Sequence, residues 1–160
     1  MVREAHVDDV PATVDVYIAV AAERQWIGGE LPIDRDERIE RFSATVADGD
    51  GQMWVAEADG EIVGMISLHP QRGRADLGMA ILDAWRGRGI GTAMMEAAIA
   101  WARAQGLDKI ALYVWPHNER AIKLYEKVGF SGEGYHPKHF RRKNGEAWDA
   151  ISMGLVLRQD

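Results

Sequence analysis

The chain has 160 residues, a formal net charge of -6 and no cysteine. This mild acidity argues against a nucleic-acid partner, which calls for a basic surface. Without cysteine there are no disulfides, thiolate metal sites or cysteine nucleophile. No apolar run approaches the ~20 residues of a membrane helix, and the N-terminus lacks a signal-peptide pattern. We therefore expect one cytoplasmic domain over residues 1–160, with no metal and no membrane partner.

The first quarter of the chain predicts two helices. An Asp-Asp-Val-Pro start at residues 8–11 precedes apolar residues at helical spacing, and a glycine-containing loop follows over 26–32. Residues 34–46 indicate a second, amphipathic helix. Its charge pairs Asp34/Arg38 and Glu37/Arg41 are expected on the solvated face.

The rest of the chain alternates strands, turns and helices. Strands over 53–56 and 62–68 flank the turn Asp59-Gly60, and a third strand over 76–82 leads into a glycine-rich stretch. A helix over 92–105, a strand over 110–115, a short helix capped by Asn118 and a hairpin around Asn144-Gly145 follow. Antiparallel strands come first and one strand–helix–strand crossover lies in the middle. The fold class is therefore α+β, with a central mixed, mostly antiparallel sheet flanked by helices.

The glycine-rich stretch joins a strand to the helix predicted over residues 92–105. Its glycines let several backbone N–H groups converge, and the helix N-terminus adds partial positive charge, so it suits a diphosphate. The spacing fits neither a Walker A loop nor the dinucleotide fingerprint, which disfavours ATP, GTP and NAD. The predicted cradle consists of Arg86, Gly87, Arg88, Gly89, Ile90, Gly91 and Thr92.

Two motifs carry a family resemblance. Arg86-x-x-Gly89-x-Gly91, after a strand and before a helix, resembles the acetyl-CoA pyrophosphate motif of the GNAT superfamily of N-acetyltransferases. Residues 118–130 resemble the family's Asn-x-x-Ala-x-x-x-Tyr-x-x-x-Gly-Phe signature. The C-terminal half is most similar to the spermidine-type and amino-compound branches. The resemblance implies a GNAT-like fold with acetyl-CoA as co-substrate.

The resemblance also implies roles for particular residues. The strand 77–81 should splay from the strand 110–115, and the pantetheine arm should bond main-chain groups of Met79, Ala80 and Ile81. Asn118 should reach the pantetheine from its cap position. Tyr125, two turns later on the same helix face, should direct its hydroxyl at the CoA sulfur as general acid or hydrogen-bond donor.

The general base and the acceptor site each have candidate residues. Direct attack needs a neutral amine, so a group must accept a proton. Asp76 is the candidate catalytic base, with a strand-edge charge as the equal alternative, and His69 is a further candidate. Some relatives carry a glutamate at the position of Tyr113, a route that is absent here. Trp26 and Glu30 are candidate acceptor-binding residues.

Two other features are interpreted as structural. The run 141–143, Arg-Arg-Lys, is expected to be solvated surface beside a turn, and Trp148 is expected to pack.

The sequence therefore predicts an N-acetyltransferase that moves acetyl from acetyl-CoA to a primary amine by direct attack in a ternary complex. A small-molecule amine is favoured over a protein N-terminus or lysine. The alternative from another class is a non-catalytic acyl-CoA-binding or sensing module. A homodimer is compatible with the sequence.

Overall fold

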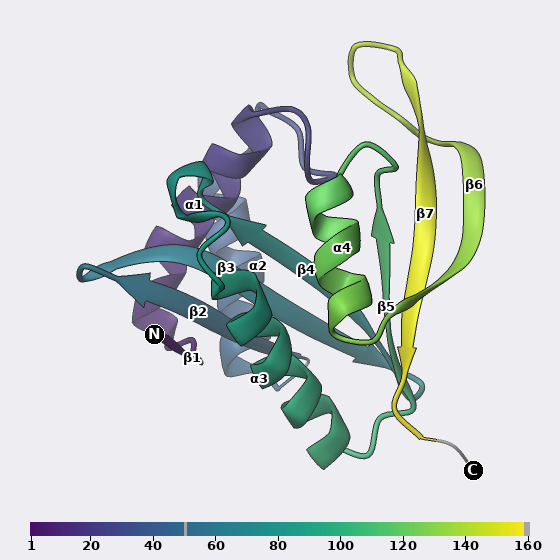
Figure 1. Ribbon diagram of the computed structural model, residues 1–160. Helices are drawn as coiled ribbons and strands as arrows, with labels where there is room; N and C mark the ends of the chain where they lie inside the picture. Colours follow the sequence, from purple (N-terminus) through teal and green to yellow (C-terminus); the bar gives the residue numbers. More distant parts are fainter. Residues whose placement is uncertain (50, 159–160) are drawn as a thin grey trace.

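The computed structural model describes residues 1–49 and 51–158, which form one mixed sheet between two pairs of helices (Figure 1). The elements in chain order are β1 (Val2–Glu4), the 3-10 helix η1 (Val7–Asp9), α1 (Val10–Ala22), α2 (Arg35–Ala47), β2 (Gln52–Ala58), β3 (Glu61–Gln71), β4 (Arg74–Ile81), the 3-10 helix η2 (Asp83–Trp85), α3 (Ile90–Ala104), β5 (Lys109–Val114), α4 (Glu119–Lys127), β6 (Ser131–Arg141) and β7 (Ala147–Val156).

The sheet has the order β1-β2-β3-β4-β5-β7-β6 within these residues. Every neighbouring pair is antiparallel except β4 and β5, which are parallel and are connected through α3. The predicted mixed, mostly antiparallel sheet is therefore confirmed. Positive φ angles at Asp59 (53°) and Gly60 (78°) give the two-residue turn that joins β2 to β3.

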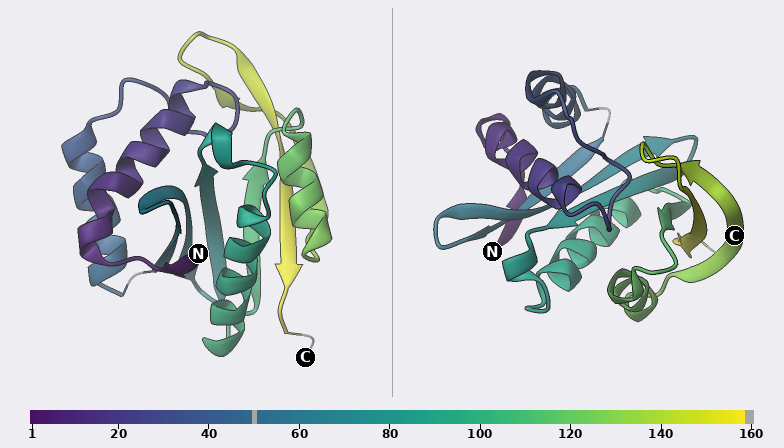
Figure 2. Two further views of the ribbon diagram at one scale, coloured as in Figure 1. Left: turned by 60° about the vertical axis from the view of Figure 1, so that its left-hand side comes forward. Right: turned by 90° about the horizontal axis from the view of Figure 1, so that it is seen from above.

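The helices cover the two faces of the sheet in pairs. Seen from above, α1 and α2 lie on one side of the sheet and α3 and α4 on the other (Figure 2). Each pair buries its own apolar cluster: Met94, Met95 and Ala98 of α3 pack under one face, and Val10, Val14 and Val20 of α1 pack under the other. Because apolar burial is the main favourable term in folding, both faces contribute to stability.

The centre of the sheet opens between β4 and β5. Their pairing runs only from Arg74–Asp76 of β4 to Lys109–Ala111 of β5. Residues 77–81 stay paired with β3 but have no partner on β5. The predicted splaying of the two strands is confirmed, and it leaves a gap at the end of β4 that meets the glycine-rich turn.

Several local predictions need correction. The strand β1 pairs with the edge of β2, although nothing in its short sequence predicted it. The helix α3 begins at Ile90, two residues earlier than predicted. Arg38, which was predicted to pair with Asp34 on the solvated face, lies over the Tyr17 ring at 4.6 Å, and Asp34 caps α2 by accepting from the Glu37 amide at 3.1 Å. Among the described residues, no helix has the length and apolar character that a membrane crossing requires.

Candidate active site

A cavity of about 730 Å³ lies where β4 and β5 part. Its wall is built from the loop after α1, the end of β4, the glycine-rich turn, the end of β5, the start of α4 and the end of β6. It brings together eleven predicted site residues, namely Trp26, Met79, Ala80, Ile81, Arg86, Gly87, Gly89, Gly91, Thr92, Asn118 and Tyr125.

The main chain of β4 offers hydrogen-bonding groups to this cavity. The amide of Leu82 donates to Val63 O of β3 at 2.9 Å. Because amides alternate sides along a strand, the main chain of Met79 and Ile81 faces away from β3, toward the unpaired edge. That of Ala80 faces β3. Met79 and Ile81 therefore turn their amides to the gap. Ala80 also lines the cavity, but its amide faces β3.

The glycine-rich turn has the open geometry that a diphosphate cradle requires. Gly87 and Gly89 have φ angles of 76° and 85°, and a Cβ at either position would meet nothing within 4 Å. Gly89 caps α3 without any side-chain bond, so the first amides of the helix keep no intrahelical acceptor. Gly91 has a different role, since a Cβ there would lie 2.8 Å from Leu124 of α4. It allows α3 and α4 to approach each other.

The charged residues of this turn differ from the prediction. The Arg86 guanidinium donates to both carboxylate oxygens of Glu23, at 2.8 and 2.6 Å, and to Ile81 O at 2.9 Å. This contact lowers the pKa of Glu23 and holds the turn against the end of α1. Arg88 lies over the Trp85 ring at 4.7 Å. Neither Arg88 nor Ile90 lines the main cavity; both border a smaller hollow at the other side of the turn.

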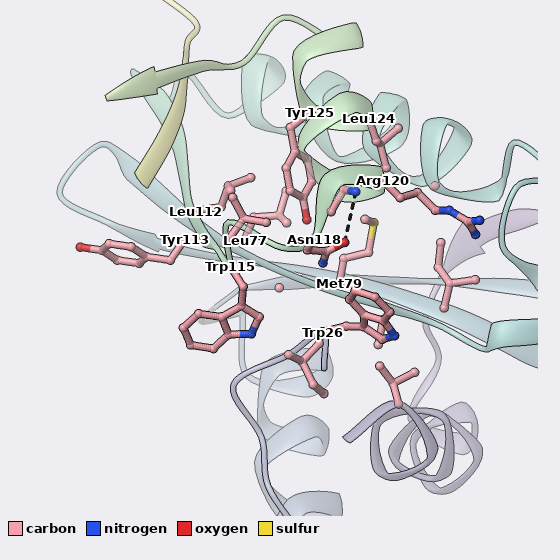
Figure 3. Close-up of a pocket in the computed structure, with 18 of the residues that line it drawn as sticks. Trp26, Leu77, Met79, Leu112, Tyr113, Trp115, Asn118, Arg120, Leu124 and Tyr125 are labelled. Carbon is pink, nitrogen blue, oxygen red and sulfur yellow. Dashed lines mark hydrogen bonds between the residues drawn. The ribbon is translucent and has the colours of Figure 1, made fainter. Parts of the chain in front are cut away.

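The two predicted α4 residues project into the cavity from the same side. Asn118 caps α4 by accepting from the Ala121 amide at 3.3 Å. Tyr125 is 7% exposed, and burial raises the pKa of its phenol to about 12. Figure 3 shows both side chains extending from α4 toward Met79, with the Tyr125 hydroxyl turned to the cavity. At neutral pH Tyr125 is therefore a hydrogen-bond donor.

Aromatic rings line the opposite side of the cavity. Trp26 and Trp115 lie across the sheet from Tyr125 in Figure 3. The Trp26 indole donates to Glu23 Oε1 at 3.0 Å. Trp148 packs behind this wall, edge-on to Trp115 at 5.2 Å between ring centroids, so the expectation that it packs is confirmed. Trp26 and Trp115 bring large apolar rings to the mouth of the cavity on the α1 side of the sheet.

The Arg-Arg-Lys run is not simply solvated surface. Arg142 is 4% exposed, with its guanidinium over the Trp148 ring at 4.2 Å. Its Nε lies 3.4 Å from a Glu30 carboxylate oxygen, and the Lys143 amide donates to the same carboxylate at 3.1 Å. The Glu30 carboxylate therefore holds the loop after α1 to the β6–β7 hairpin and does not line the cavity.

The two predicted base candidates also lie outside the cavity wall. The Asp76 side chain is 54% exposed and forms an ion pair with Arg74 at 3.0 Å. It sits at the last paired position of β4, before the strands part. His69 of β3 pairs with Asp76 of β4 in the sheet, and the His69 Nε2 lies 3.2 Å from Ser67 Oγ. The interpretation of Asp76 as a strand-edge charge agrees with this placement.

The cavity also contains residues that sequence reasoning passed over. Leu112, Trp115, Arg120, Leu124, His139 and Phe140 all line it. The position of Arg120, in the first turn of α4 after Asn118, was a usable signal. The position of His139 gave no such signal, because this residue lies in an irregular stretch of β6.

Comparison with known proteins identifies the family. Residues 17–130 match the model of the acetyltransferase (GNAT) family. The chain belongs to the GNAT acetyltransferases. It is 29% identical, over 98% of its length and 94% of the relative's, to an L-methionine sulfoximine/L-methionine sulfone acetyltransferase of Pseudomonas paraeruginosa. It is 38% identical to the L-amino acid N-acetyltransferase AaaT of Escherichia coli, over 64% of this chain and 66% of that one.

Comparison with solved structures agrees with this family assignment at the level of the fold. The GNAT chain described here superposes with a TM-score of 0.90 on a putative acetyltransferase of Salmonella typhimurium, solved with acetyl-CoA. The two are 22% identical, and the match covers 100% of this chain and 95% of that one.

Acetyl-CoA is the co-substrate of this GNAT acetyltransferase, and the cavity has groups of the right kind to hold it. The open glycine turn at the N-terminus of α3 suits the two linked phosphates. The unpaired main chain of β4 suits the amide groups of a pantetheine arm. No group of three or more His, Asp or Glu side chains within the described residues is arranged to hold a metal ion.

Proposed function

We propose that this chain transfers acetyl from acetyl-CoA to the primary amine of a small amino compound, by direct attack in a ternary complex. The observation that carries this proposal is a cavity that passes through the opened sheet between Tyr125 on one side and Trp26 and Trp115 on the other. A donor on the α3–α4 side and an acceptor on the α1 side meet at the gap. Because the chain has no cysteine, no acyl-cysteine intermediate can form, and direct transfer is the simpler mechanism.

The donor half of the site uses mainly backbone groups. The amides at the start of α3 bind the diphosphate, and the main chain of Met79 and Ile81 bonds the pantetheine and the thioester carbonyl oxygen. Asn118 contributes its side-chain amide from the cap of α4. Arg120, at the rim of the cavity, adds a positive charge that Arg86, paired with Glu23, does not supply.

Tyr125 acts on the leaving sulfur. Its phenol has a pKa of about 12, well above the ~8.5 of a thiol. The proton therefore stays on the phenol at equilibrium, and Tyr125 stabilises the departing thiolate as a hydrogen-bond donor.

Among the described lining residues, the acceptor half has no free carboxylate for a second cationic group on the acceptor. Trp26, Trp115 and Phe140 make this wall aromatic. The only acidic residue among the described lining residues is Asp83, which is 84% exposed at its side chain and pairs with Arg86 at 3.3 Å. A polyamine would therefore find no free carboxylate partner for its extra ammonium groups among these described residues. The relatives named for methionine sulfoximine and for amino acids support an amino-acid-like acceptor.

The test is thiol release from acetyl-CoA across three acceptor panels, together with calorimetry of CoA binding. The panels are amino acids and their sulfone analogues, polyamines, and peptides with free N-termini or lysines. We expect turnover with the first panel and at least tenfold lower kcat/KM with the other two. Tight CoA binding without turnover on any panel would favour the acyl-CoA-sensing alternative, and preferred turnover of peptides would make this a protein acetyltransferase.

A further inference from the structure

Few side chains of the cavity are able to accept a proton from the attacking amine. Among the described lining residues, the ionisable ones are Asp83, Arg86, Tyr113, Arg120, Tyr125 and His139. Arginine stays charged and phenols are poor bases near neutral pH. Asp83 is engaged by Arg86 at the edge of the glycine turn. The one imidazole of the wall is His139, the side-chain type whose ordinary pKa lies nearest to neutrality.

His139 lies on the side of the sheet from which the acceptor arrives. Leu112 and Val114 of β5 pack into the cluster beneath α3 and α4, so Tyr113 between them points to the opposite face. The His139 ring stacks on Tyr113, with centroids 4.9 Å apart and an angle of 27° between the planes. His139 and Tyr125 therefore line the same cavity from opposite faces of the sheet, as a base and a thiolate-stabilising donor require.

An irregularity in the pairing of β6 with β7 positions the His139 ring. The pairing of β6 with β7 shifts between His136 and Phe140, and Lys138 within the shift has a φ angle of 50°. Left-handed backbone is uncommon for a residue with a side chain. Here the Lys138 amide donates to Asp149 Oδ1 at 2.8 Å, which stabilises that conformation. Bulges of this kind re-aim side chains beside active sites.

The surroundings leave the His139 ring nitrogens available. Its ring contacts are Tyr113 of β5 and His136 of β6, the latter with centroids 5.2 Å apart. His136 in turn has its Nε2 2.9 Å from Ser152 Oγ on β7. The amide of the adjacent Lys138 donates to the Asp149 carboxylate, which also accepts from the Tyr135 hydroxyl. No hydrogen bond to the His139 ring is present among the described residues.

We propose that His139 is the catalytic base that deprotonates the acceptor amine. This inference rests on the proposed acetyl transfer. The acceptor ammonium gives one proton to a ring nitrogen of His139, which passes it to solvent. The freed lone pair forms the N–C bond to the thioester carbonyl carbon, and the C–S bond breaks with its electron pair on sulfur. The nitrogen loses a second proton, and the thiolate gains one to become the thiol. Ammonium and thioester thus give amide, thiol and one proton.

The test compares His139→Gln with wild type in kcat/KM for the amine over about pH 6 to 9. We expect a loss of at least about 100-fold near pH 7, typical of a missing general base. The loss should shrink as the pH approaches the ~8 of an α-amino group, which then deprotonates unaided. CoA affinity should be unchanged. Added imidazole should restore at least tenfold of the rate to His139→Ala.

The matched control is His69→Gln, a histidine outside the cavity, which should retain wild-type kinetics. A His139→Gln profile within threefold of wild type at every pH overturns the assignment while leaving acetyl transfer intact. A pH-independent loss that imidazole does not restore also overturns it, because a positioning role would behave in that way. If the wild-type protein acetylates no amine, the proposed function falls, and the base with it.

Discussion

Tyr125 owes its chemistry to where α4 buries it. Its side chain packs beside Phe130, with ring centroids 5.8 Å apart, and loss of water raises the pKa of its phenol to about 12. The raised pKa keeps the proton on the oxygen throughout the neutral and mildly alkaline range. The phenol loses its proton only as pH rises through that value, so the role proposed for Tyr125 does not titrate in the neutral range.

We expect Tyr125→Phe to lower kcat about 10- to 100-fold, the ~1.5–3 kcal/mol of a hydrogen bond to a charged group. The KM for acetyl-CoA should change little. Because the phenol stays protonated, the ratio of wild-type to variant rate should be constant from about pH 7 to 10. Steady-state kinetics over that range check this, with Tyr17→Phe, outside the cavity, as the control. A ratio that collapses below pH 10 would mean that Tyr125 ionises in the working range.

The glycine turn before α3 is open because its glycines have no side chains. Gly89 combines a φ angle of 85° with open space at the N-terminus of α3. Gly60 in the β2–β3 turn has nearly the same backbone, with a φ angle of 78°, and equally open space, but it lies outside the cavity. The two positions therefore separate ligand contact from backbone strain.

We expect Gly89→Asp to weaken CoA binding at least tenfold, because a carboxylate would occupy the anion site. Gly60→Asp should carry similar strain and bind CoA as wild type does. Calorimetric titration of both variants with CoA checks this. Equal affinities would place the diphosphate elsewhere.

The loop after α1 and the β6–β7 hairpin meet through one buried charge. Arg142 contacts Glu30 at 3.4 Å and stacks on Trp148, and His117 Nε2 lies 2.7 Å from Gln25 O in the same loop. This contact holds the loop that carries Trp26 against the C-terminal half of the sheet. Removing one partner of such a pair leaves the other charge partly buried and uncompensated.

We expect Arg142→Met to lower the free energy of unfolding by about 3 kcal/mol and to raise the KM for the amine more than that for acetyl-CoA. The double variant Arg142→Met/Glu30→Gln should recover part of the stability. Lys109→Met, which breaks the more exposed Lys109–Glu133 pair, should cost under ~1 kcal/mol. Denaturant unfolding and two-substrate kinetics measure these effects. An Arg142→Met protein as stable as wild type would contradict the structural role.

At the scale of the whole molecule, the sequence predicts what local patterns encode. The starts of α1, α2 and α4, the Asp59-Gly60 turn and the spacing of Asn118 and Tyr125 depend on residues close together in the chain, and these predictions agree with the structure. The sites of Glu30, Arg142 and His139 depend on contacts between distant segments and on a register shift in β6. The ion pair of Asp76 with Arg74 is a different case, because residues two apart on a strand share a face and the pair was therefore predictable from the sequence.

The short pairing between β4 and β5 has a consequence for the protein before it meets its donor. Three residues on each strand join the two halves of the sheet, and the amides of Met79 and Ile81 beyond them have no neighbouring strand to satisfy them. Buried main-chain groups seldom stay unmatched, so water must solvate this seam until an extended molecule rich in amides replaces it. We expect the pantetheine arm of the coenzyme to lie there as a further strand between β4 and β5.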